Sequence, residues 1–156
     1  MRRVFGLFGV AILAVVMAFT TATPAVAGHD DDRFQVVLRP IQFHYEDVGR
    51  RGPSAGDYFV FSEKLFNQGE RVGRDSGRCD VTRVGRDKFT FQCFVTLTLR
   101  GQGKITLQGE LRFRRSGPAP GRLAITGGTR RYAGAAGSAR LVEQRGEPTR
   151  LRLRLR

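Results

Sequence analysis

The sequence predicts an all-β domain, and three observations carry that prediction. In several runs apolar and polar residues alternate with period two, as they do in strands with one buried face. The runs are short and rich in Val, Phe, Thr and Leu, and turn residues such as Gly, Asp and Pro separate them. No segment of the folded part has a helical period. Seven or eight antiparallel strands in about 130 residues are typical of a closed barrel or a sandwich, and closure leaves no unpaired edge.

The first 27 residues have the order of a secretory signal peptide. Arg2 and Arg3 follow the first methionine, residues 4–19 are uncharged and apolar, and the segment ends in small residues at Ala25 and Ala27. The apolar stretch of 16 residues is shorter than the about 20 residues that cross a bilayer. We therefore expect cleavage after Ala27, with an uncleaved tether as the alternative, and in either case a secreted or extracytoplasmic location.

The rest of the chain has the size of one domain and a strong basic bias. Removing 27 of the 156 residues leaves 129, in which we expect a flexible acidic leader at residues 28–33 and one folded domain at 34–156. Two of the 27 Lys and Arg lie in the signal, so 25 remain against 14 Asp and Glu, a net charge of +11. The arginines are spread along the strands without a dense run or interleaved aromatics, so no specific nucleic-acid site is expected. Outside the cell, an anionic envelope polymer is the expected electrostatic partner.

The clearest strand is predicted at residues 89–100. Phe89, Cys93 and Leu99 share one face with three other apolar residues, and Thr and Gln occupy the opposite face. Residues 104–114 repeat the pattern beyond a glycine turn and form its hairpin partner. The final residues alternate Leu with Arg and predict a last strand whose arginines face water. Further strands are expected at residues 34–45, 56–65, 77–84, 121–126 and 137–143.

Four segments resemble the allene oxide cyclase and dirigent superfamily, namely residues 56–61, 72–79, 103–109 and 124–137. The most specific is the last, an Ala-Ile-Thr-Gly-Gly-Thr run followed by an aromatic residue and further glycines. Adjacent glycines allow positive φ and a close crossing of chains. The resemblance implies an eight-stranded antiparallel barrel, often a homodimer or homotrimer, that holds a small apolar molecule in its mouth. Members of the superfamily guide cyclisation or radical coupling, which confinement can promote without a strong acid or base.

The segment around Glu46 is similar to the cyclase segment that supplies a pocket glutamate, and Pro53 also matches it. The Asn that follows this glutamate in the cyclases is Val48 here, and a second pocket Asn falls at Glu63. Valine can neither donate nor accept a hydrogen bond through its side chain, so true allene oxide cyclase activity is not expected. The resemblance implies Glu46 as a catalytic acid or base, because burial in an apolar barrel would disfavour its ionised form. It also implies a ligand-binding role for Tyr45, Glu63 and Pro53.

The strand alternation leaves the direction of Glu46 open. Phe43 and Tyr45 fall on one face, and His44 and Glu46 fall on the other. If the aromatic residues fill the core, Glu46 points to solvent. His44 is the only histidine of the folded part, and neither metal-ligand spacing nor a nucleophile motif accompanies it. The sequence therefore predicts a structural histidine, no metal site and no cofactor.

The chain has two cysteines, Cys79 and Cys93. If residues 85–87 form a hairpin loop, the two positions are symmetric about Arg86 and lie opposite each other on adjacent strands. Cys79 also matches a cysteine near the cyclase pocket, but the presence of a second cysteine favours a structural bridge over a reactive thiol. In an oxidising compartment we expect a disulfide, which would stabilise the fold by roughly 3 kcal/mol.

Two functional interpretations follow. The first is a secreted barrel that binds a small apolar molecule and guides its cyclisation or coupling. The alternative is a non-catalytic basic envelope or interaction protein built on the same barrel. The barrel interior separates them, because buried polar groups in an open cavity favour chemistry, whereas an interior filled with Phe and Leu favours the alternative.

Overall fold

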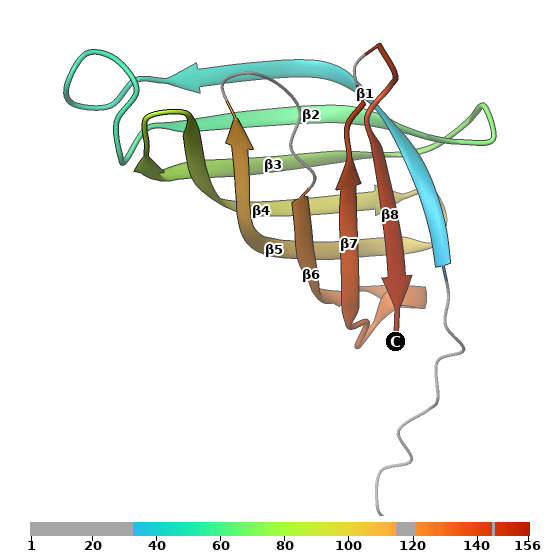
Figure 1. The fold of residues 1–156 in the computed structure, drawn as a ribbon. Coiled ribbons are helices and arrows are strands. Elements are labelled where there is room, and N and C mark those ends of the chain that lie inside the picture. The colour runs from blue at the N-terminus through green and yellow to red at the C-terminus, as the bar shows by residue number, and fades with distance from the viewer. Residues whose placement is uncertain (1–32, 115–120, 145) are drawn as a thin grey trace, which may run out of the picture.

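A computed structural model describes residues 33–114, 121–144 and 146–156 and shows a closed, antiparallel, eight-stranded barrel (Figure 1). Each strand pairs with its neighbours in chain order, and the last strand pairs back onto the first. This confirms the predicted all-β barrel. The expected signal peptide and residues 28–32 of the leader lie outside the described residues. The strands are β1 Arg33–Glu46, β2 Tyr58–Asn67, β3 Glu70–Val84, β4 Lys88–Leu99, β5 Gly103–Arg114, β6 Gly121–Gly128, β7 Gly137–Val142 and β8 Arg150–Leu155, with one 3-10 turn, η1, at Arg130–Tyr132.

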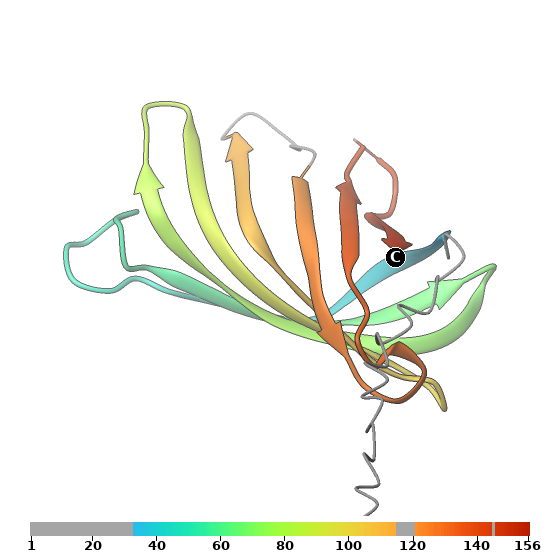
Figure 2. The same ribbon diagram turned by 90° about the horizontal axis from the view of Figure 1, so that it is seen from below.

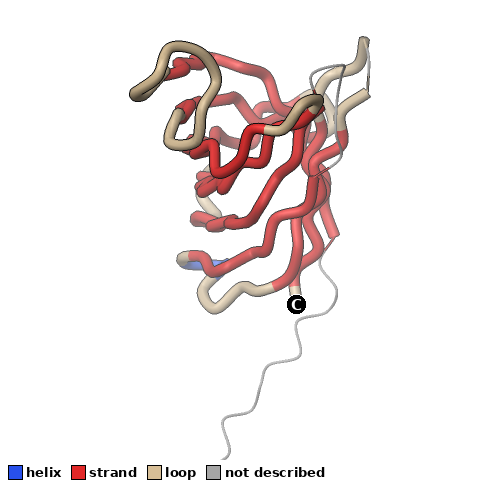
Figure 3. Tube along the Cα trace, turned by 60° about the vertical axis from the view of Figure 1, so that its left-hand side comes forward, coloured by secondary structure: helices blue, strands red, loops and turns tan. Residues whose placement is uncertain are grey.

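The barrel is closed near one end and open toward the other. The first strand pairs with β8 only through residues 33–37, whereas it pairs with β2 from Val37 to Glu46. Similarly, β5 pairs with β4 along its whole length but with β6 only from Ile105 to Gln108. The strands therefore spread apart beyond the closed ring (Figure 2) and form one curved wall when seen from the side (Figure 3). Within the described residues, no helix is long and apolar enough to cross a membrane.

Alternating side chains build the core of the closed end. Leu65, Leu97 and Ile105 have no exposed surface, and they belong to one cluster that receives side chains from all eight strands. Leu151 and Leu153 of the last strand are also buried, while the arginines between them are exposed, as the sequence predicts. Each buried leucine of this kind contributes about 2 kcal/mol through the removal of apolar surface from water.

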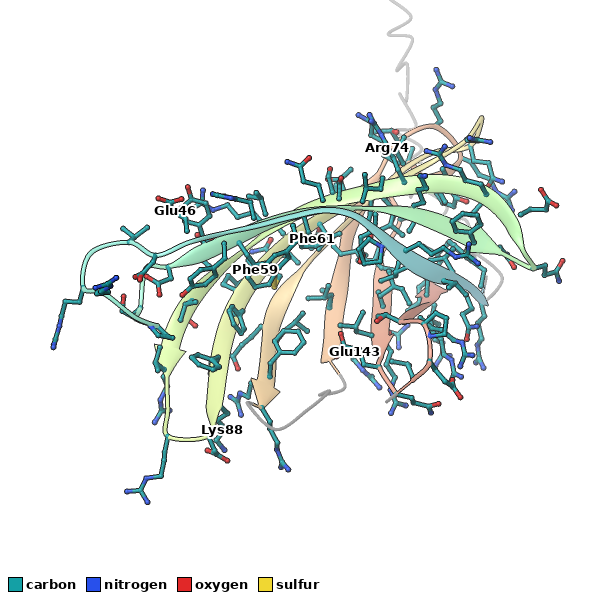
Figure 4. The ribbon with its side chains drawn as sticks, turned by 90° about the horizontal axis from the view of Figure 1, so that it is seen from above. Glu46, Phe59, Phe61, Arg74, Lys88 and Glu143 are labelled. Atoms are coloured by element: carbon teal, nitrogen blue, oxygen red, sulfur yellow. A yellow bond between two sulfur atoms is a disulfide. The ribbon has the colours of Figure 1, made fainter. Side chains whose placement is uncertain are left out.

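A β-bulge in β1 decides which of its side chains face inward. The ladder to β2 skips Ile41, so Pro40 pairs with Glu63 before the bulge, and Phe43 and Tyr45 pair with inward phenylalanines after it. Such an extra residue shifts the alternation by one position. As a result, Glu46 lies on the outer face of the strand, on the opposite side of the wall from the labelled phenylalanines (Figure 4).

The predicted disulfide is present. Cys79 and Cys93 pair directly across β3 and β4 and are bonded to each other. The route to this register differs from the expected one, because Val84 pairs with Phe89 and the connection is one residue longer than a three-residue loop. A β-bulge at Thr82 adds one unpaired residue to β3. The two offsets cancel, so the cysteines still meet.

Candidate functional site

The open half of the barrel encloses a cavity of about 510 Å³. Aromatic rings line it in a connected series across β1, β2, β4 and β5, with ring centroids 5.2–5.4 Å apart for Phe43–Phe59, Phe59–Phe91 and Phe91–Phe113. Figure 4 shows the inward direction of two of them, Phe59 and Phe61. The interior at this end is therefore an aromatic-walled space and is not packed solid. Its six phenylalanines are Phe43, Phe59, Phe61, Phe89, Phe91 and Phe113.

Strand β3 makes room for these rings by presenting small residues on its inner face. A Cβ atom added to Gly77 would lie 2.6 Å from Cζ of Phe61, so the ring occupies the place of a side chain. Two residues further on, the Cys79–Cys93 disulfide forms part of the same wall. The cavity thus depends on a strand whose inward residues carry little volume.

Two carboxyl groups face each other inside this cavity. Glu63 of β2 and Asp75 of β3 are direct partners in the ladder, and both line the cavity. Asp75 is 2% exposed, and its Oδ1 atom has no hydrogen-bond partner. A third carboxyl group, that of Glu143, follows the end of β7 and also lines the cavity. A buried oxygen without a partner is costly, so this atom is available to a donor on a ligand.

The surroundings of these acids favour their protonated forms. Burial raises the pKa of Asp75 to about 7, and the nearby carboxylate of Glu63 adds to the rise. Burial also raises the pKa of Glu63, with a further contribution from the charge of Glu143, and burial raises the pKa of Glu143 itself. No Lys, Arg or His is among the described residues that line the cavity. Because Glu63 and Asp75 face each other in this apolar surrounding, the pair retains a proton close to neutral pH.

These acids do not form a metal site. No group of three or more His, Cys, Asp or Glu in the described part of the chain is arranged to hold a metal ion. The pair consists of a protonated carboxyl that can donate a hydrogen bond and a second carboxyl that can accept one. That combination suits general acid–base chemistry on a bound molecule.

Of the catalytic and ligand-binding residues predicted from the sequence, Glu63 alone lines the cavity. Glu46 lies on the exposed outer face, where its carboxylate is 3.1 Å from Nε2 of His44. The bulge at Ile41 accounts for this position. Catalysis by Glu46 therefore gains no support from the cavity and remains a prediction.

Tyr45 and Pro53 belong to the rim and to the loop between β1 and β2. The hydroxyl of Tyr45 donates a 2.5 Å hydrogen bond to Asp57, whose carboxylate also accepts from the backbone of Val48 and from both the backbone and the hydroxyl of Ser54. The hydrogen bond raises the pKa of Tyr45 to about 12 and lowers that of Asp57 to about 2. Pro53 is exposed within this loop. Asp57 thus anchors the loop, and neither Tyr45 nor Pro53 is among the cavity-lining residues.

A second hollow, of about 540 Å³, lies around Phe94 on the outer face of the wall. Its outward side chains are mostly hydroxyl-bearing and apolar, such as Thr96 and Val60, and no titratable residue is among those that line it. Because it offers neither an acid nor a base, the inner cavity is the better candidate for a chemical site.

Sequence analysis did not single out Asp75 or Glu143 as site residues. The alternation in β3 offered a signal, because counting back in steps of two from Val81 and Cys79 reaches Asp75 on the inner face. Glu143 was assigned only to the end of a predicted strand. Its place in the cavity depends on the course of the chain after β7.

The fold and its acid-bearing aromatic cavity define an antiparallel β-barrel with a candidate site in its interior. The chain belongs to the allene oxide cyclase barrel-like family, whose domain model matches residues 39–152. This confirms the superfamily expected from the sequence. No curated protein matches the chain.

Solved structures share the fold. A pyocyanin demethylase is 29% identical with a TM-score of 0.71, and the match covers 80% of this chain and all of the other. A Diels–Alderase from Streptomyces koyangensis is 18% identical with a TM-score of 0.63, over 83% of this chain and 72% of the other. A pterocarpan synthase dirigent protein is 13% identical with a TM-score of 0.56, over 81% and 93%. The last two show a common fold only.

Proposed function

We propose that this protein binds a flat, largely apolar small molecule in the barrel cavity and guides its cyclisation or coupling, with Asp75 and Glu63 as the acid–base pair. One observation carries the proposal: a buried carboxyl group with an unpartnered oxygen faces an aromatic-walled cavity. A volume of about 510 Å³ lies within the usual range for small-molecule sites, which combine apolar walls with a few placed polar groups.

The wall indicates the shape of the ligand. Phe59, Phe91 and Phe113 meet in edge-to-face contacts, with interplanar angles of 71° and 69°. Rings held in this way by their neighbours present fixed faces and edges to a guest, and aromatic pairs gain about 0.5–1.5 kcal/mol beyond the area that they bury. A planar conjugated molecule therefore fits this wall better than a flexible chain does.

The acids indicate the polarity of the ligand. Among the described residues, three carboxyl groups and no basic group face the cavity, so an anionic ligand would be disfavoured there by repulsion and desolvation. A ligand with an N–H or O–H group can instead donate to the free Oδ1 of Asp75. The expected substrate is thus neutral or cationic, with a donor at the end that reaches β2 and β3.

The proposed acid–base chemistry follows from the proton that Asp75 and Glu63 share. Protonated Asp75 can deliver a proton to an oxygen or carbon that gains charge during ring closure, while ionised Glu63 can remove one elsewhere on the same molecule. A cyclisation of this kind leaves the composition of the substrate unchanged. The aromatic wall contributes by holding the reacting ends together. The names of the related structures, which include a Diels–Alderase and a pterocarpan synthase dirigent protein, support ring-forming chemistry on this barrel.

We further propose that the protein works outside the cytoplasm. The Cys79–Cys93 disulfide supports this location, because such bonds persist in oxidising compartments. The signal-like order of residues 1–27 is consistent with it. Mass spectrometry of the exported protein tests the prediction, since an N-terminus at Gly28 is expected.

Untargeted mass spectrometry tests the catalytic proposal. The mature protein is incubated with a small-molecule extract of cells that produce it, and the mixture is compared with matched incubations of the Asp75→Asn and Glu63→Gln variants. Cyclisation gives a product of unchanged mass and altered retention time, whereas coupling gives a product near twice the mass. Wild-type protein should form such a product and both variants should lose it. Products that form equally with the variants would refute the role of the acid pair.

Binding is tested separately with Nile red, a neutral planar dye. Val95→Trp adds a large side chain to the inner face and should abolish the fluorescence increase, because Val95 lines the cavity. Phe94→Trp changes the adjacent residue, which is 48% exposed on the outer face, and should leave binding unchanged. Equal effects of the two variants would show that the dye binds elsewhere.

A further inference from the structure

The titratable side chains that line the described part of the cavity are all acids. They are Glu63 of β2, Asp75 of β3 and Glu143, which directly follows β7. Strands β1, β4, β5, β6 and β8 contribute no titratable group to this lining, because the cysteines in the wall are joined in a disulfide. Glu143 approaches from the side of β7, across the interior from the phenylalanines of β2 (Figure 4).

The three acids lie close enough to affect one another's charge. The negative charge of Glu143 makes Glu63 harder to ionise, and the charge of Glu63 does the same for Asp75. Like charges in an apolar surrounding are costly because little water screens them. A positive group placed among these acids would be attracted by each of them. The acid cluster therefore favours a cationic guest over a neutral guest of the same shape.

The aromatic wall favours the same charge and a flat shape. Six phenylalanines line the cavity, and the faces of aromatic rings carry partial negative charge that attracts cations. The connected rings extend from β1 and β2 to β4 and β5, as the contacts of Phe43 with Phe59 and of Phe91 with Phe113 show. A compact ammonium group would touch only one or two of these rings. A planar cation can spread along the series and place its charge over several of them.

The buried carboxyl group of Asp75 adds a requirement for a hydrogen-bond donor. Asp75 is 2% exposed, and its Oδ1 atom has no partner. Such an acceptor costs free energy until a donor reaches it. A quaternary ammonium group supplies charge without a donor, and a neutral hydrocarbon supplies neither. A heteroaromatic ring that carries an amino group conjugated to a protonated ring nitrogen supplies the charge, the flat shape and the N–H donor together.

From the clustered acids, the aromatic wall and the free acceptor we infer that the cavity selects a planar heteroaromatic cation with an N–H donor over the neutral molecule of the same shape. This inference rests on the proposed function and deepens it by naming the charge of the ligand. Ionised Glu63 balances that charge, so Asp75 can keep the proton that the proposed chemistry uses. The basic exterior is screened by water and salt, and the preference is therefore determined inside the cavity.

Three fluorescent acridines with the same ring system serve as probes. At pH 7.5, 9-aminoacridine is a cation with N–H donors, acridine is neutral, and acridine-9-carboxylate is an anion. Fluorescence titration of the mature protein should give a dissociation constant at least about tenfold lower for 9-aminoacridine than for acridine, with the anion weakest. Because carboxyl groups lose protons as the pH rises, the affinity for 9-aminoacridine, which stays cationic throughout, should increase between pH 5 and pH 8.

Substitution of the acids locates the effect. Glu63→Gln keeps the size of the side chain and removes its charge, so 9-aminoacridine should bind at least about tenfold more weakly, while acridine should change by less than about threefold. Glu143→Gln should act in the same direction and supplies a second variant if Glu63→Gln folds poorly. The matched control is Glu110→Gln, because this exposed carboxylate on the outer face of β5 is paired with Arg112. It should change the affinity for either probe by less than about threefold.

The outcomes separate this inference from the proposed function. Equal affinities for 9-aminoacridine and acridine, or a cation affinity that does not change with pH, would overturn the inference, even if Nile red still binds and a product still forms. Failure of all three acridines to bind would overturn it as well. A preference for the cation that depends on Glu63, together with products that form equally in the acid variants, would instead support the inference and refute the catalytic proposal.

Discussion

The raised pKa of Asp75 gives the barrel a pH-dependent stability that can be measured without a substrate. Burial and the charge of Glu63 raise this pKa from 3.8 to about 7. The folded chain therefore holds a proton between pH 4 and 7 that the unfolded chain has released. Stability falls as pH rises wherever the native state binds more protons. At about 1.4 kcal/mol for each pKa unit, the loss across this window is on the order of 4 kcal/mol, and it is complete above pH 7.

The variant Asp75→Asn isolates this effect, because asparagine keeps the size of the side chain and cannot ionise. Urea unfolding at pH 4, 5, 6, 7 and 8 should show that wild-type stability falls relative to the variant by about 1.4 kcal/mol for each pH unit up to pH 7. Asp80→Asn, on the outer face of the same strand, controls for the loss of one negative charge. Parallel stability curves for wild type and Asp75→Asn would refute a buried, proton-holding Asp75.

Three further changes test the wall and its rim. Replacing both Cys79 and Cys93 by Ala should lower the free energy of unfolding by about 3 kcal/mol in urea titrations, and reduction of the wild type should reproduce that loss. Tyr45→Phe removes a donor to the Asp57 carboxylate, so the amide of Val48 should exchange hydrogen faster; unchanged exchange would mean that the other donors suffice. Gly77→Ala should lower the melting temperature, because its methyl group would lie 2.8 Å from a backbone oxygen of β4, and a wild-type melting curve would contradict this crowding.

The closed end of the barrel was predictable because its side chains follow period two without interruption. In β4, β5 and β8 every second residue is apolar or glycine and is buried or half-buried, so the sequence pattern and the burial coincide. The start of β3 was missed, although the strand begins at Glu70 and includes residues 70–76. Its inner face there carries Gly73 and Asp75, which have no apolar side chain to mark a strand. Gly73 is needed because a Cβ atom would lie 2.2 Å from a backbone oxygen of β4.

The candidate site was predictable only in part. The family resemblance predicted Glu63 as a ligand-binding residue, and Glu63 does line the cavity. Its partner Asp75 lies 12 residues away in sequence, and the register that joins them passes through a hairpin and an irregularity between Leu65 and Phe66. The residue pairs beyond such a bulge cannot be found by counting along the sequence, because one extra residue moves every later side chain to the opposite face. The same effect at Ile41 separates Glu46 from the cavity.

The alternation of inward and outward side chains along each strand also explains how a chain with net charge +13 can keep an acidic interior. In a single-layered wall, consecutive residues point to opposite sides, so opposite charges can occupy the same strand without meeting. Strand β7 carries Arg140 on the outer face, and Glu143, one position beyond its end, reaches the cavity. Water screens the outer arginines, whereas the apolar wall leaves the inner acids poorly solvated, so the excess positive charge does little to favour their ionised forms. The protonation of Asp75 is therefore determined by its neighbours inside the barrel, and replacement of an outer arginine such as Arg140 should not change it.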